Sequence, residues 1–329
     1  PLKHFNDEKN FKNILLKKKV NNKFFPLPIF FGINKKKYFK IKNKKIIKLF
    51  LKNKYIAAIK IKNFFNIKKK FFGRKLFGLN YKKHPYYLKF SKENYIFLDF
   101  EYIKINKKNL RHKYFVPPSI FKKKLKKVST LAGFHTRNVP HTAHQWVHKF
   151  MIKKYSKILI QPLIGQYKKG EYLDSTIIKA NLLAIQMYDK KALYVPYFSY
   201  PRYGGPLESA LHALVRKNYG CTHFWVGRDH AGYKKYFSKY SSQSFCFKNQ
   251  NKLGIKIIVQ KEPYYCHGCK KIVNKKCLKN LCKRSLKIVI SGTKVRNYLR
   301  KNKDIPEIIM NKKISKILNK NSIINSLKK

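Results

Sequence analysis

The chain has 329 residues, of which 44% are hydrophobic and 15% aromatic, so it can bury one or two domain cores and is not a disordered tail. Its net charge of +65 favours a nucleic-acid partner at first sight, but 69 of the 78 basic residues are Lys and only 9 are Arg. Arg is the residue whose planar side chain grips phosphates and base edges. We therefore interpret the charge as a compositional bias of the whole chain and do not expect a nucleic-acid partner.

The apolar runs are too short for a membrane span, because none reaches 18 residues. The start of the chain, Pro1 to Asn10, is polar and does not resemble a signal peptide. A cytoplasmic location without membrane contact is the expectation.

Residues 1–122 hold short apolar and aromatic runs that are broken by Lys and Asn, which predicts a β-rich domain. The runs are Phe24–Phe31, Ile46–Leu51, Tyr55–Ile61 and Tyr95–Phe100. Pro117 and Pro118 mark a boundary or linker.

Residues 123–295 alternate between predicted strands and helices, which is typical of a doubly wound α/β domain with a parallel sheet. The predicted strands are Val128–Phe134, Ile158–Pro162, Ala192–Pro196, Thr222–Val226, Gly254–Val259 and Ile288–Ile290, and the predicted helices are His141–Tyr155, Ser175–Tyr188 and Glu208–Asn218. Ligands of such folds bind beyond the carboxyl ends of the strands. The remaining residues, 296–329, are predicted to form a small helical region.

The first chemical motif, His135 to His144, reads HTRNVPHTAH and joins a strand to a helix. The free N–H groups and the dipole at a helix start attract anions. His141 and His144 are three residues apart and share one face of the first turns, where they suit nucleotide phosphates. Arg137 can hold a tetrahedral oxyanion with two hydrogen bonds. Taken alone, the spacing of the two histidines favours a metal pair or surface residues over a nucleotide role, and only the full motif reverses this preference.

Two further motifs follow the predicted helices and strands. Tyr200–Pro206 contains two glycines before a helix, which permits close approach of a ligand, and Arg202 adds positive charge; an ordinary Gly-Pro turn is the alternative. Gly227–Gly232 reads GRDHAG directly after a strand, and Arg228 is a candidate for balancing charge in a transition state. A salt-bridged loop is the alternative there.

A fourth motif, Ile290–Arg296, lies between a strand and a helix. Ser291 and Thr293 can cap the helix or contact a phosphate, and capping is the simpler interpretation.

Together these segments resemble ATP sulfurylases, because HTRNVPHTAH, YPRYGG, RKNYGCTHFWVGRDHAG and ISGTKVRNYL occur in that family's order and approximate spacing. The resemblance is dense from about residue 125 to 310 and general over 1–120. It implies a PUA-like N-terminal domain followed by a Rossmann-like nucleotidyltransferase domain. It also implies a homo-oligomer that uses ATP, sulfate, adenosine 5′-phosphosulfate and pyrophosphate, with Mg²⁺ on the phosphates.

The resemblance also implies individual roles. The residues expected to bind ATP are His135, Arg137, Asn138, His141, His144, Arg202, Gly227, Arg228, Asp229, His230 and Val259. Sulfate is expected at His135, Arg137 and Ala231, and the catalytic set is Thr136, Arg137, Asn138, His141, His144 and Arg228. One departure stands out: the family motif normally begins with Gln, and His135 stands in that place. An imidazole can still donate a hydrogen bond to an oxyanion.

Four of the six cysteines lie close together, at Cys266, Cys269, Cys277 and Cys282. Two pairs of thiolates can complete a tetrahedral zinc site with no open position, which would make the metal structural. Residues 263–284 resemble the zinc-binding insert of some prokaryotic ATP sulfurylases. Reduced thiols without metal are the alternative, and Cys221 and Cys246 are expected to be core or surface thiols.

The implied reaction is an in-line attack of a sulfate oxygen on the α-phosphorus of ATP, with release of pyrophosphate and no covalent enzyme intermediate. Catalysis would then depend on positioning and charge neutralisation. An RNA-binding protein on a degenerate sulfurylase scaffold is the alternative, since residues 1–130 carry 38 basic and 5 acidic side chains, a net charge of +33.

Overall fold

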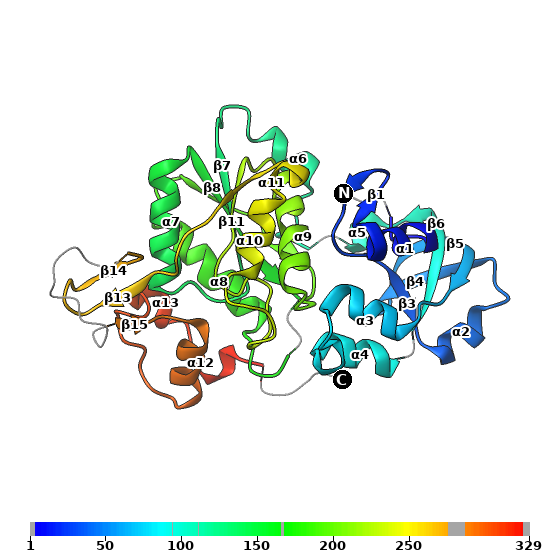
Figure 1. Ribbon diagram of the computed structural model, residues 1–329. Coiled ribbons are helices and arrows are strands. Elements are labelled where there is room, and N and C mark those ends of the chain that lie inside the picture. The colour runs from blue at the N-terminus through cyan, green and yellow to red at the C-terminus, as the bar shows by residue number, and fades with distance from the viewer. Residues whose placement is uncertain (1–3, 94, 111, 166–167, 276–286, 325–329) are drawn as a thin grey trace.

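The computed structural model describes residues 4–93, 95–110, 112–165, 168–275 and 287–324, and its N-terminal and catalytic parts lie side by side as two separate bodies (Figure 1). No helix among these described residues is both long and apolar enough to cross a membrane.

The N-terminal part packs helices against a four-stranded antiparallel sheet of order β3-β6-β5-β4. Its strands are β1 (Lys19–Val20), β2 (Lys23–Phe24), β3 (Phe31–Ile33), β4 (Ile46–Leu51), β5 (Lys54–Phe65) and β6 (Ile96–Ile105). Its helices are α1 (Glu8–Lys17), α2 (Lys35–Ile41), α3 (Lys69–Phe77), η1 (Tyr81–Lys83), α4 (Pro85–Glu93) and α5 (Lys107–Leu110). The next helix, α6 (Pro118–Lys123), packs on the catalytic part, where Phe121 contacts Tyr219. The strands β4, β5 and β6 were predicted from their aromatic and β-branched runs. The short strand β1 was missed, and so were the helices, because Lys and Asn interrupt their apolar spacing.

One predicted strand of this part is wrong. Phe24–Phe31 is not continuous, because β2 ends at Phe24 and β3 begins at Phe31. Pro26 and Pro28 lie between them, and proline has no N–H to donate to a neighbouring strand.

The catalytic part is built on a six-stranded parallel sheet of order β10-β8-β7-β11-β12, with β9 also paired to β8. Its strands are β7 (Leu131–Thr136), β8 (Lys157–Ile164), β9 (Ala192–Tyr194), β10 (Tyr197–Phe198), β11 (His223–Trp225) and β12 (Lys256–Ile258). Its helices are α7 (Thr142–Lys154), α8 (Asp174–Ile185), α9 (Gly205–Asn218), α10 (Ser241–Lys248) and α11 (Gln250–Leu253). The predicted doubly wound sheet is confirmed, with boundaries that differ by a few residues. The predicted strand Ile288–Ile290 is not part of it, because Lys287–Val289 pairs antiparallel with Tyr264–Cys266 in a separate sheet.

The side chains of β7 alternate between two cores, as they must in a strand buried on both faces. Ala132 and Phe134 pack in one core with α7, and Leu131 packs in the other with α9 and α10. The chain leaves β7 toward β8 on one side and returns to β11 on the other. This reversal of strand order creates a switch point at the carboxyl ends of β7 and β11, where ligands of open α/β sheets bind.

The last part of the described chain has a three-stranded antiparallel sheet and short helices. The sheet joins β13 (Tyr264–Cys266), β14 (Lys271–Val273) and β15 (Lys287–Val289) in the order β14-β13-β15. The helices are α12 (Gly292–Arg300), α13 (Lys312–Ser315) and η3 (Lys320–Ser322), in agreement with the helical C-terminal region that was predicted.

Candidate active site

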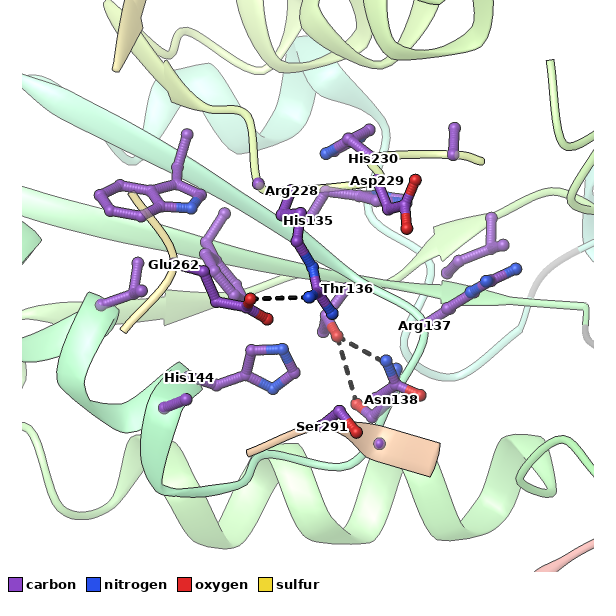
Figure 2. A pocket seen from close by; sticks show the side chains of 18 of the residues that line it. His135, Thr136, Arg137, Asn138, His144, Arg228, Asp229, His230, Glu262 and Ser291 are labelled. Carbon is purple, nitrogen blue, oxygen red and sulfur yellow. Dashed lines mark hydrogen bonds and ion pairs between the residues drawn. The ribbon is translucent and has the colours of Figure 1, made fainter. Parts of the chain in front are cut away.

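A cleft lies at the switch point of the sheet and is lined from the ends of β7 and β11, the start of α7 and the start of α12. It brings together eleven residues that the sequence singled out: His135, Thr136, Arg137, Asn138, His141, His144, Gly227, Arg228, Asp229, His230 and Ala231. Figure 2 shows several of these side chains around one space, with His144 on one side and Arg137 on the other. Residues almost 100 positions apart therefore share one cleft.

The two histidines of the first motif lie at the start of α7. His141 is the N-cap residue, and its Nδ1 accepts a hydrogen bond from the backbone N–H of His144 at 3.3 Å. Their rings stack with centroids 3.8 Å apart. Burial, followed by the neighbouring histidine, holds the pKa of His141 well below its usual range, and burial lowers the pKa of His144 to about 4. Both imidazoles are therefore neutral at pH 7.

Arg137 is held by two neighbours rather than extending freely. Its Nη1 lies 3.8 Å from Glu171 Oε1, and its guanidinium lies over the ring of Tyr203 at 5.1 Å. The Tyr203 hydroxyl donates to the same Glu171 oxygen at 2.7 Å. This arrangement orients a cation in the cleft without burying a close ion pair.

Asn138 connects β7 to α12. Its Oδ1 accepts from Arg296 Nη1 at 2.9 Å, and its backbone N–H donates to Thr136 Oγ1 at 3.0 Å. Ser291 caps α12 by accepting from the backbone N–H of Lys294 at 3.3 Å. The helix start thus faces the cleft beside Asn138, and the capping interpretation of Ser291 is confirmed.

The GRDHAG segment forms a tight loop after β11. Asp229 and Ala231 have left-handed backbone conformations, with φ of 52° and 55°. The loop is fixed by Gly205 N–H, which donates to the Ala231 carbonyl at 3.0 Å, and by Ser242 Oγ, which donates to the His230 carbonyl at 2.8 Å. Backbone strain of this kind persists where the surrounding contacts hold it, commonly at functional sites.

Arg228 forms an ion pair across the cleft. Its Nη1 lies 2.8 Å from Glu262 Oε2, and both side chains are partly exposed (Figure 2). Burial raises the pKa of the Glu262 carboxyl, although the nearby Arg228 opposes this shift.

The comparisons with known proteins agree on one family. The chain matches the ATP-sulfurylase family over residues 112–321 and a PUA-like domain over residues 1–98. It is 32% identical over 328 residues to the sulfate adenylyltransferase of Ignicoccus hospitalis and 30% identical to that of Staphylothermus marinus, and each alignment covers 97% of this chain and 84% of the relative. The chain belongs to the ATP sulfurylase family.

The fold has a structural relative as well. A hexameric APS kinase from Thiobacillus denitrificans superposes with a TM-score of 0.69 over 95% of this chain and 57% of that chain, at 12% sequence identity. At this identity the likeness supports the overall fold alone, whereas the succession of a PUA-like domain and an ATP-sulfurylase domain rests on the family matches.

Two of the residues that were predicted to bind ATP, Arg202 and Val259, do not line the cleft. Arg202 is buried with its guanidinium over the ring of Tyr200 at 4.3 Å, and its neighbours Pro201 and Tyr203 line the cleft instead. Val259 is also outside the lining, whereas the next residue, Gln260, is part of it. The contacts of these two residues with ATP stay predictions.

The sequence missed several residues that do line the cleft, chiefly Glu208, His212 and Glu262. Glu208 is buried, and its carboxylate accepts from the backbone N–H groups of Arg202 at 3.0 Å and Gly204 at 2.9 Å. Chain order alone does not reveal these contacts. One signal was present: an acidic residue is rare in a chain with only 13 of them.

The cysteine cluster lies partly outside the described residues. Cys266 ends β13, and Cys269 lies in the turn that leads into β14. Two of the four predicted zinc ligands therefore lie at the same end of one antiparallel hairpin. Cys277 and Cys282 are outside the described residues, and Cys221 and Cys246 are buried in the core, where burial raises the pKa of Cys221 to about 12 and of Cys246 to about 11.

Proposed function

We propose that this chain is a sulfate adenylyltransferase, which converts ATP and sulfate into adenosine 5′-phosphosulfate and pyrophosphate. The observation that carries this proposal is the single cleft into which the two histidines of α7, the Arg137 segment and the GRDHAG loop all project. The family assignment favours this activity over the RNA-binding alternative.

Sulfate would bind at Arg137, His135 and the backbone of Ala231, next to the α-phosphate. One sulfate oxygen then forms a bond to the α-phosphorus while the bond from that phosphorus to the bridging oxygen of pyrophosphate breaks. No protein nucleophile is required, so the protein contributes position and charge.

ATP would lie with its phosphates between the start of α7 and the GRDHAG loop. Neutral His141 and His144 can each donate one hydrogen bond to phosphate oxygens, and Asn138 and Gly227 would contact the nucleotide. Arg228 would leave Glu262 for the phosphates, and Mg²⁺ would arrive as the complex with ATP or pyrophosphate.

Zinc is a separate, structural part of the proposal. Cys266 and Cys269 fit half of a tetrahedral thiolate site, since a two-residue spacing in a hairpin turn brings two sulfurs to one end. Cys277 and Cys282 would supply the other two ligands. We also propose that the chain acts in the cytoplasm as a homo-oligomer.

The decisive experiment measures ATP formation from adenosine 5′-phosphosulfate and pyrophosphate with Mg²⁺. Steady ATP formation that depends on both substrates supports the proposal. A folded protein that forms no ATP, and that also releases no pyrophosphate from ATP with sulfate, contradicts it.

A further inference from the structure

Arg216, on α9, is a buried cation that the proposed reaction does not use. Its side chain is completely buried, and among the described residues it has no carboxylate within ion-pair distance. Its Nη1 donates to the His212 carbonyl at 3.3 Å, and its Nη2 donates to the Gln161 carbonyl at 3.1 Å. Nη2 also lies 2.6 Å from Nδ1 of His135. Burying an arginine without a carboxylate partner costs free energy, which these three contacts only partly offset.

The strand beside it is shaped for this side chain. Gly133 and His135 lie on the same face of β7, two residues apart, and α9 covers that face. A Cβ on Gly133 would lie 2.7 Å from Arg216 Cγ. The missing side chain at Gly133 therefore leaves the channel through which Arg216 reaches His135.

The contact determines which nitrogen of His135 carries the proton. A guanidinium has only N–H donors and no acceptor, so Nδ1 of His135 has to accept. Burial lowers the pKa of His135 well below its usual range, with smaller contributions from His212, Arg216, His230 and Arg137, which keeps the ring neutral. A neutral ring that accepts at Nδ1 carries its single proton on Nε2.

The second ring nitrogen of His135, Nε2, is not used by the surrounding side chains. Among the described residues Nε2 of His135 has no hydrogen-bond partner, and it is not one of the enclosed side-chain atoms that lack one. His135 lines the cleft. Its Nε2–H is thus an available donor next to the expected sulfate position.

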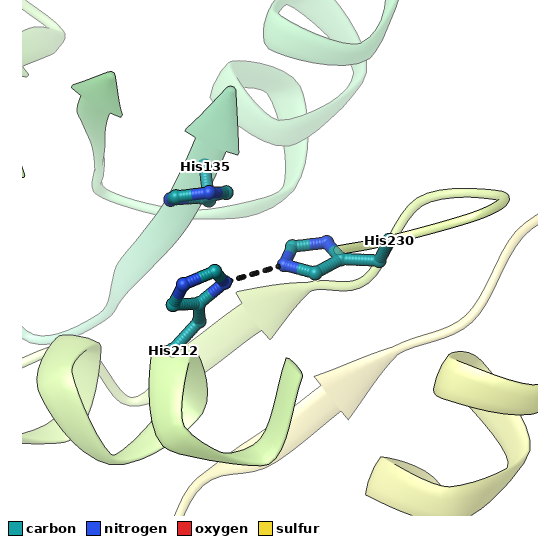
Figure 3. A group of neighbouring side chains, drawn as sticks. All are labelled: His135, His212 and His230. Carbon is teal, nitrogen blue, oxygen red and sulfur yellow. Dashed lines mark hydrogen bonds between the residues drawn. The ribbon is translucent and has the colours of Figure 1, made fainter. Parts of the chain in front are cut away.

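The same proton argues against a metal at the neighbouring histidines. His135, His212 and His230 converge (Figure 3), and one ring nitrogen of each lies within 4.8 Å of the others. His212 Nδ1 and His230 Nε2 are 3.1 Å apart and share a hydrogen bond. A metal would need a lone pair on His135, but Nδ1 is taken by a donor from Arg216 and Nε2 carries the proton. His135 is therefore arranged to donate a hydrogen bond rather than to bind a metal ion.

We propose that Arg216 is a positioning residue that fixes His135 as an Nε2–H donor toward the acceptor anion. A Gln side chain in this place would accept from Arg216 at its carbonyl oxygen and present its N–H₂ to the cleft in the same way. This explains how His135 can stand where the family normally has Gln. The anion is sulfate if the proposed function holds, and the inference rests on that function only for this assignment.

The protonation of His135 can be read directly by ¹⁵N NMR of protein labelled at histidine. The His135→Gln variant identifies the His135 signals, and His223→Gln, at the opposite end of the sheet, is the matched control. We expect an unprotonated Nδ1 and a protonated Nε2 at pH 7, with the Nε2 signal shifting when sulfate is added with ATP analogue. A protonated Nδ1, or signals that ignore sulfate, overturns the proposal. Neither outcome depends on turnover, so failure here is separate from failure of the sulfurylase activity.

Two variants test the role of Arg216. Gly133→Ala displaces the side chain and keeps its charge, and Arg216→Met removes the charge. Each should raise the KM for sulfate about tenfold, because the loss of one charge-assisted hydrogen bond weakens binding by about that factor. The KM for ATP should stay unchanged. In a His135→Ala background the same changes should no longer affect the sulfate KM. An equal rise in both backgrounds, or a shared fall in kcat alone, would show that Arg216 is only structural.

Discussion

Arg228 has two competing partners, one present and one expected. In the structure its guanidinium pairs with Glu262, and in the proposed reaction it pairs with phosphate oxygens. Because the ion pair is partly exposed, its own contribution to stability is small, on the order of 1 kcal/mol or less. The pair can therefore open for substrate at little cost.

Replacing Arg228 with Ala should lower kcat by about 100- to 1000-fold, because the variant loses a positive charge that stabilises the transition state. The measurement is the rate of ATP formation under saturating substrates. Arg74→Ala, an exposed arginine of α3, is the matched control and should keep the normal rate. Near-normal turnover of the Arg228 variant would contradict its catalytic role.

Glu262→Gln should strengthen the binding of pyrophosphate. The change removes a negative charge from a cleft that takes a triphosphate and leaves Arg228 without its ion-pair partner. We expect the KM for pyrophosphate to fall by about two- to tenfold, corresponding to roughly 0.4–1.4 kcal/mol. A higher KM would instead indicate that the Glu262 carboxylate holds Mg²⁺ or a ribose hydroxyl.

At the scale of elements, the sequence predicted those that carry strong local signals. The strand-turn-helix unit around His141 follows from its periodicity, and its place at the cleft follows from the rule for parallel sheets. Glu208 and Glu262 were not predicted, because their positions depend on backbone turns and on packing between distant segments. The segment around Cys269 was predicted as a metal-binding motif, but the two strands β13 and β14 that flank its turn were not predicted.

The start of α12 is a second element whose fit can be tested. A Cβ on Gly292 would lie 2.5 Å from Asn138 Oδ1, the atom that accepts from Arg296. Gly292→Ala should therefore displace Asn138. The KM for ATP should rise about tenfold, because one or two hydrogen bonds to the nucleotide are lost. Asn297→Ala, exposed on the same helix, is the control. Unchanged nucleotide binding by the glycine variant would remove Asn138 from the ATP site.

Zinc removal belongs to the same scale, because the sheet that carries Cys266 has only three strands of three residues each, and so few paired residues contribute little stability of their own. Treatment with a chelator should lower the melting temperature and release about one zinc ion per chain, measured by atomic absorption. Cys266→Ser should give the same result without a chelator, whereas Cys246→Ser should retain the metal. A metal-free protein with unchanged melting would leave the four cysteines as thiols.

At the scale of the whole molecule, the two parts meet at His84. This buried residue donates from Nε2 to the Tyr203 carbonyl at 2.9 Å and stacks on Phe77 with ring centroids 3.8 Å apart. Tyr236 adds a hydrogen bond from its hydroxyl to the Phe77 carbonyl at 2.8 Å. Tyr203 itself has a left-handed backbone, with φ of 57°. The N-terminal part therefore helps to hold a strained loop of the cleft.

Acid should weaken this junction. Burial lowers the pKa of His84 to about 4 from its usual 6.5, and Nδ1 is buried without a partner. The unfolded chain thus binds a proton more readily than the folded one between these values, so stability falls as the pH drops from 6.5 toward 4. We expect the melting temperature to decrease over this range and His84→Gln to reduce the decrease. An equal acid response in both proteins would assign it to other histidines, such as His144.

The bond between His84 and Tyr203 also sets a limit on how freely the first 120 residues can diverge. Most of that region resembles the family only in general outline, as expected where substitutions toward Lys and Asn are tolerated at the surface. His84, Phe77 and Tyr236 form one contact with the catalytic loop, and a change in one alters the fit of the others. Among natural homologues these three positions should change together, and far more slowly than the lysine-rich surface around them.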